Sequence, residues 1–223
     1  MRLARRPLRA AAGAASVLLA ACAGQPVPDW QLSSKAAIDR SVAAYLSGDG
    51  ALEAAQFELA RQEVARTGRA DLLARIELIR CAARVASLQF EACDGFEKLR
   101  TLADRSERAY ADFLAGRLRE QDIGLLPAAQ REVAAGASAD AASAALQKIE
   151  EPFPRLVAAG VLFETGRANP DAIGRAVETA SAQGWRRPLL AWLNVQAARA
   201  EKAGAVDEAE RLRRRIGLVQ DPN

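Results

Sequence analysis

The chain has 223 residues, of which 50% are hydrophobic and only 5% aromatic, and it contains no histidine. The missing histidine excludes Ser-His and Cys-His catalysis and histidine-bound metals. The abundance of Ala, Leu, Arg and Glu favours an all-α fold with room for one sizeable core.

The first 21 residues have the order of parts of an export signal. Arg2, Arg5, Arg6 and Arg9 precede an apolar run over residues 10–21, which ends in small residues. A transmembrane helix is the alternative, but a run of 12 residues is too short to cross a hydrocarbon core of about 30 Å. The order predicts a signal peptide over residues 1–21.

The signal ends in Leu19, Ala20, Ala21 and Cys22, which resembles the lipobox of bacterial lipoproteins. The resemblance implies that Cys22 carries a thioether-linked diacylglycerol, becomes the new N-terminus and receives a further fatty acid such as palmitate. Ala23 stands where aspartate would resemble an inner-membrane retention signal. The family rule therefore implies an outer-membrane anchor, with the protein facing the periplasm.

The net charge of +3 and the pI near 9.0 come from this signal. Without its four arginines, 27 basic residues face 28 acidic ones, a net charge of −1. This balance removes the argument for a nucleic-acid partner.

Residues 22–30 contain Pro26 and Pro28 without periodicity and read as a lipidated N-terminus with a flexible tether. Residues 31–220 read as a single helical domain punctuated by glycine. We expect helices from Ser33 or Ser34 to residue 47, then over 51–66, from about 70, and over 96–103, 106–117, 128–135, 139–149, 152–165, 170–183, 188–203 and 206–216.

Two-helix units separated by glycine resemble tetratricopeptide repeats, most closely over residues 193–218. Ala197 matches the small residue of the first helix, Gly204 the turn, and Ala209 the end of the family's Asp-Glu-Ala motif. The resemblance implies a stacked α-solenoid; an ordinary antiparallel helical array remains the alternative. It also implies that a stripe of the first helix faces a partner on the concave side, formed by Asn194, Ala198 and Glu201.

Cys81 and Cys93 are the thiols that remain after lipidation. An exported pair tends to oxidise, and four extended residues can return over the distance that a helix climbs from Cys81. We expect a disulfide; two buried thiols are the alternative. The spacing is not C-x-x-C, which disfavours a redox enzyme.

The basic run over residues 211–215 has two interpretations. Cations suit the C-terminus of a helix, and they also suit anionic lipid headgroups. The helix-end interpretation is the simpler one.

These features favour a non-catalytic adaptor that is anchored in the membrane and binds another envelope protein. They imply no cofactor, no metal and no small-molecule substrate. An enzyme that acts on the cell wall with a single acid such as Glu164 or Glu178 is one alternative, and a structural spacer without a dedicated partner is the other.

Overall fold

The computed structural model describes residues 27–221, so Cys22 and the predicted signal peptide lie outside the described residues. The described chain forms eleven α-helices and one 3-10 helix, and it contains no strand. The all-helical prediction is therefore confirmed for this part. The helices are α1 (Asp29–Ser47), α2 (Gly50–Ala65), α3 (Ala70–Ala86), α4 (Asp94–Glu97), α5 (Arg105–Leu114), η1 (Glu120–Leu125), α6 (Ala128–Ala135), α7 (Ala139–Gln147), α8 (Pro152–Glu164), α9 (Pro170–Ala182), α10 (Arg186–Lys202) and α11 (Val206–Gln220).

Glycine and proline set most helix boundaries, as the sequence predicts. Gly48 and Gly204 adopt the left-handed conformation, with φ of 97° and 71°, at the ends of the α1 and α10 segments. At the start of α9, Pro170 occupies the first turn and the side-chain oxygen of Asn169 accepts a hydrogen bond of 2.9 Å from the Ala172 amide.

Several boundaries differ from the prediction, among them the end of α11, which lies at Gln220 and not near residue 216. Helix α1 begins at Asp29, inside the predicted tether, and Ser34 lies within the helix with its hydroxyl bonded to the Gln31 carbonyl. The segment after Phe96 forms a short helix and then turns, because α4 ends at Glu97. The segment before α6, where no helix was predicted, contains the 3-10 helix η1.

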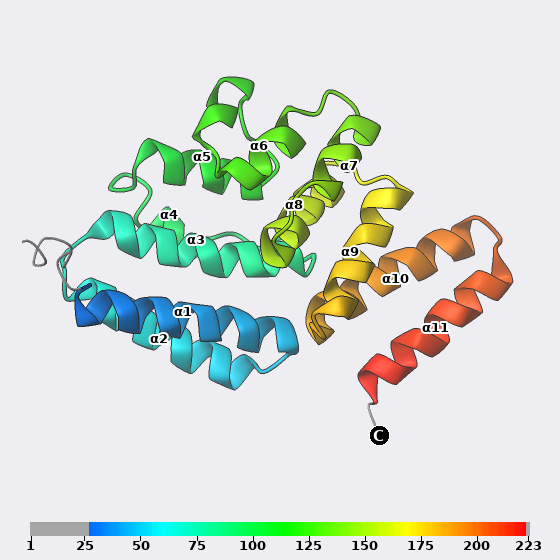
Figure 1. The fold of residues 1–223 in the computed structure, drawn as a ribbon, viewed down its shortest axis with the longest axis horizontal. Helices are drawn as coiled ribbons and strands as arrows, with labels where there is room; N and C mark the ends of the chain where they lie inside the picture. Colours follow the sequence, from blue (N-terminus) through cyan, green and yellow to red (C-terminus); the bar gives the residue numbers. More distant parts are fainter. Residues whose placement is uncertain (1–26, 222–223) are drawn as a thin grey trace, which may run out of the picture.

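Helices α1 and α2 pair in antiparallel fashion and lie against α3, while α9, α10 and α11 form the opposite end of the molecule (Figure 1). The centre of the fold is the contact between α3 and α8. There, Gly160 of α8 is so close to α3 that an added Cβ would lie 2.3 Å from the Val85 carbonyl oxygen.

The main core surrounds this crossing and includes Leu78, Leu156, Leu162 and the fully buried Trp192. The indole N–H of Trp192 donates a 3.1 Å hydrogen bond to the Ala86 carbonyl at the end of α3. A smaller cluster between α1, α2 and α3 contains Phe57. None of the helices that the structure describes combines the length and apolar character needed to cross a membrane.

Buried acids join neighbouring helices through arginine. Glu53 of α2 accepts hydrogen bonds of 2.7 and 3.2 Å from Arg80 of α3. Glu107 of α5 accepts one of 2.7 Å from Arg75 of α3. Because a buried carboxylate is costly without a partner, these ion pairs fix how the helices stack.

Candidate functional site

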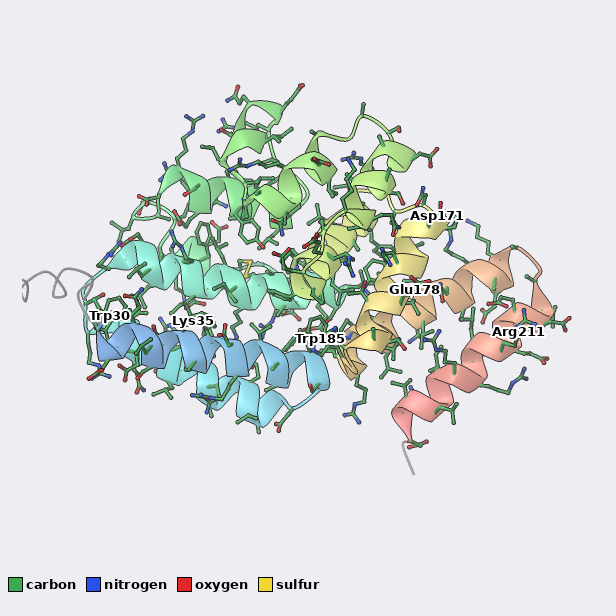
Figure 2. All side chains as sticks on the ribbon, in the orientation of Figure 1. Trp30, Lys35, Asp171, Glu178, Trp185 and Arg211 are labelled. Atoms are coloured by element: carbon green, nitrogen blue, oxygen red, sulfur yellow. A yellow bond between two sulfur atoms is a disulfide. The ribbon has the colours of Figure 1, made fainter. Side chains whose placement is uncertain are left out.

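A disulfide closes the segment that follows α3. Cys81 lies in α3 and Cys93 directly precedes α4, and their Cα atoms are 5.9 Å apart. Figure 2 shows the bond in yellow beside α3. The predicted disulfide is therefore present, and it holds residues 87–92 against the body of the protein.

The same segment is also held by aromatic contacts. The ring of Phe90 stacks on Phe163 of α8, with centroids 6.3 Å apart, and Phe163 meets Trp192 edge-on at 5.8 Å. On the other side, the Tyr45 hydroxyl donates a 2.5 Å hydrogen bond to the Gln89 side chain. Residues 89–92 of the segment are thus exposed but held in place, while Ser87 is buried.

A pocket of about 370 Å³, which we call the Phe90 pocket, opens beside this segment. Its volume lies within the range usual for ligand sites. Buried apolar residues, including Val85, Ala111 and Leu114, form its inner wall. Its remaining lining residues include Phe90, Cys93 and the charged side chains of Glu91, Glu97, Arg117 and Glu164.

The three acids of the Phe90 pocket differ in their partners. Glu97 accepts hydrogen bonds of 2.7 and 3.0 Å from Arg100, and this guanidinium lowers the pKa of Glu97. Glu91 lies 3.7 Å from Arg84. Glu164, by contrast, forms no ion pair within the part of the chain that the structure describes, although it lines the same pocket.

A second pocket, of about 440 Å³, lies between α2, α3 and α4. Its buried acid is Glu77, which is 2.9 Å from Arg61; burial raises the pKa of Glu77, although the charge of Arg61 opposes the shift. A Cβ added to Gly95 would lie 2.0 Å from the Glu77 carboxylate, so α4 rests directly on this group. This contact fixes the position of α4 on α3, so we assign Glu77 a structural role.

Glu178, the other acid considered for catalysis, lines a third pocket, which includes residues of α9. This pocket shares no lining residue with the Phe90 pocket. Its side chain is 73% exposed and lies 3.6 Å from Arg175. Figure 2 labels Glu178 and Asp171 on the same helix.

The predicted partner-binding stripe of α10 is exposed in full, since Asn194, Ala198 and Glu201 are all on the surface. Two of the three already have partners within the fold. The Asn194 amide donates a 2.7 Å hydrogen bond to the Leu190 carbonyl, and Glu201 pairs with Arg213 of α11 at 2.6 Å. Glu201 thereby ties α10 to α11.

Three of the four arginines in the basic run of α11 pair with acids, and Arg215 donates a hydrogen bond to the Ser181 hydroxyl. Arg211 bonds to Glu208, Arg213 to Glu201, and Arg214 lies 3.7 Å from Glu210. Helix α11 also lies at the opposite end of the molecule from the start of α1, where the described chain begins (Figure 1). Both observations argue against contact with lipid next to the proposed anchor. The helix-end interpretation is wrong, because α11 continues to Gln220 and has no basic residue in its last turn, so residues 211–215 lie in the middle of the helix.

Among residues 27–221, no group of three or more acidic or cysteine side chains is placed to hold a metal ion. No protein-family model, no curated protein and no solved structure matches this chain.

The Phe90 pocket was not anticipated from the sequence, in which no pattern marks residues 87–92 as part of a binding site. The available signal was the position of Phe90 and Glu91 between two cysteines that we expected to bond. The contribution of Glu164 depends on the packing of α8 against α3 and α5, which no local pattern shows.

Proposed function

We propose that this protein is a lipid-anchored adaptor of the bacterial envelope that faces the periplasm from the outer membrane and binds another envelope protein without catalysing a reaction. The observation that carries the proposal is the sequence Leu19-Ala20-Ala21-Cys22 at the end of an apolar run. Two or three acyl chains on Cys22 would give stable membrane attachment, which one chain does not.

The disulfide between Cys81 and Cys93 supports export. Disulfides form and persist in oxidising compartments such as the periplasm and are rare in the cytosol. The bond lies in the surface segment next to the Phe90 pocket, so oxidation shapes a surface that is available to a partner.

The helix pairs support a tetratricopeptide-like reading. Helices α1 and α2 meet across Gly48, and α10 and α11 meet across Gly204. Ala197 and Ala209, the small residues of the last pair, are 5% and 3% exposed. Stacked helix pairs commonly present a protein-binding surface, and the exposed stripe at Asn194 and Ala198 is the part that the family resemblance would assign to it.

The chemistry of the chain favours binding over catalysis. Without histidine, the chain has neither the usual general base near neutral pH nor the commonest metal ligand. A pocket with an apolar wall and charged lining residues at a rigid surface segment suits recognition of a partner.

The anchor is tested by replacing Cys22 with serine in the full chain and growing cells with labelled palmitate. We expect Cys22→Ser to lose the label and to disappear from the outer-membrane fraction, whereas a chain with Cys81→Ser and Cys93→Ser keeps both. A Cys22→Ser protein that still incorporates palmitate and remains in the outer membrane would contradict the anchor.

The adaptor function is tested separately by crosslinking in intact cells followed by mass spectrometry. We expect one protein to be recovered reproducibly with the wild-type chain and to be lost with Cys22→Ser. Recovery of lipid and abundant membrane proteins alone would favour a structural spacer.

A further inference from the structure

Three helices end at the Phe90 pocket. Val85 belongs to the last turn of α3, Leu114 is the last residue of α5, and Glu164 is the last residue of α8; all three residues line the pocket. The C-terminus of an α-helix carries a partial negative charge of about half an electron. The three C-termini favour a cation, and only the short helix α4, which begins at the pocket after Cys93, opposes them.

The side chains add to this preference. Three carboxylates, those of Glu91, Glu97 and Glu164, line the pocket together with a single guanidinium, that of Arg117. Arg117 lies 3.3 Å from Asp112, which is outside the pocket lining, and 3.8 Å from Glu97, so its charge is already balanced by these two acids. Arg84 and Arg100 offset Glu91 and Glu97, but Glu164 forms no ion pair in the described chain. Glu164 is thus the carboxylate that can receive an incoming cation.

The remaining lining is apolar. Val85, Ala111 and Leu114 are buried, and the ring of Phe90 is 36% exposed while the stack with Phe163 holds it in place. An aromatic ring attracts a cation that lies against its face, and an apolar wall accepts an alkyl chain. The pocket thus fits a ligand with an apolar stem and a positive end.

The backbone next to the pocket is open to a peptide. The segment from residue 89 to residue 92 has no regular secondary structure and is exposed. The amides of Phe90, Glu91 and Ala92 donate no hydrogen bond to another main-chain group within residues 27–221. An extended peptide can satisfy such groups through its own main chain, whereas a free amine cannot.

We propose that the Phe90 pocket binds a lysine or arginine side chain presented on an extended segment of a partner protein, with Glu164 as the partner of the charged end and Phe90 beside the stem. The inference rests on the adaptor function and names the chemistry of its partner.

Binding is measured by fluorescence anisotropy with the full oxidised chain in detergent. The probes are blocked, dye-labelled pentapeptides with a central lysine, arginine, norleucine or glutamate between alanines. We expect the lysine and arginine peptides to bind, and the norleucine peptide, which keeps the stem and loses the charge, to bind about tenfold or more weakly. Salt at 0.5 M weakens the binding of the lysine peptide, because it screens exposed charges.

The site is located with Glu164→Gln, which removes a charge at nearly constant volume. We expect this change to weaken the binding of the lysine peptide about fivefold, which corresponds to the loss of one partly exposed charge pair. Glu178→Gln is the matched control, since Glu178 is an exposed helix acid in another pocket, and it leaves the affinity unchanged.

Three results would overturn the assignment. Equal binding of the norleucine and lysine peptides would show that the site recognises only an apolar chain. Equal loss of affinity with Glu164→Gln and Glu178→Gln would show unspecific charge attraction. Competition by butylammonium as tight as the binding of the lysine peptide would show that the peptide main chain contributes nothing. Each of these leaves the adaptor function standing. That function fails instead if crosslinking in cells recovers no specific protein.

Discussion

Gly160 is the residue on which the central helix crossing depends. It lies in the middle of α8, where glycine normally weakens a helix, and it faces the carbonyl oxygen of Val85 in α3. A helix interior tolerates this cost when the missing side chain lets two backbones approach. The approach places Val85, Trp192 and the end of α3 in one core.

We expect Gly160→Ala to destabilise the protein by about 2–3 kcal/mol, because the new methyl group forces α3 and α8 apart. The measurement is the urea unfolding midpoint with an unchanged dependence on denaturant.

Gly174→Ala in α9 is the control, since a Cβ there would meet nothing within 4 Å. It should stabilise the protein by about 0.5–1 kcal/mol through the lower flexibility of the unfolded chain. Similar effects of the two alanines would mean that the close approach is not what holds the helices together.

Some of these single-residue roles were readable from the sequence and others were not. Cys81 and Cys93 could be paired in advance, because a helix followed by a short return brings them together. Gly160 and Glu164 could not be assigned, because their roles depend on which helix packs on α8. Which helix packs on α8 is determined by the core as a whole and not by any local sequence pattern.

At the scale of elements, the sequence predicted the helices best where glycine and proline mark both ends. The bounds of α6 match the prediction, and those of α8 and α9 agree to within one residue. The prediction was wrong after Phe96, where the chain turns although its residues favour a helix. Phe96 is fully buried there, so tertiary packing overrides the local preference.

The disulfide stabilises one such element, the segment between α3 and α4. It closes a loop with a sequence separation of 12, and the chain-entropy relation gives about 3 kcal/mol for a loop of this size. We expect the variant with Cys81→Ser and Cys93→Ser to unfold at a lower urea concentration by a corresponding amount.

The matching experiment adds dithiothreitol to both proteins. The reductant should lower the stability of the wild type toward that of the double variant and leave the variant unchanged. A wild-type protein that is insensitive to the reductant, with the bond shown by mass spectrometry to be broken, would contradict a stabilising role.

At the scale of the whole molecule, the two ends of the helical array are joined. The Arg187 side chain of α10 donates a 2.8 Å hydrogen bond to the Tyr45 carbonyl of α1 and lies 4.5 Å from the centre of the Tyr45 ring. Burial raises the pKa of Tyr45, while the charge of Arg187 opposes the shift. The contact connects residues that are 142 positions apart.

We expect Arg187→Ala to cost about 1–2 kcal/mol, from one charged hydrogen bond and one cation–π contact. Hydrogen exchange should quicken at the end of α1 and in α2, because these helices lose their attachment to α10.

Arg199→Ala is the control, since Arg199 is exposed on the same helix and its side chain forms no hydrogen bond or ion pair in the described chain. It should leave both measurements unchanged. Equal exchange rates in the two variants would show that the Arg187 contact does not hold α1 to α10.

The pairing of α3 with α8, and of α1 with α10, has a consequence for how the protein folds. In most helical proteins, contacts between near neighbours in sequence form first and folding is fast. Here the inner face of α3 is completed only by residues about 75 to 110 positions later, including Gly160 and Trp192. A chain emerging from its N-terminus therefore carries the apolar side of α3 only partly covered, by α4 and α5, until α8 and α10 have followed. Loop closure, rather than helix formation, then limits the rate of folding.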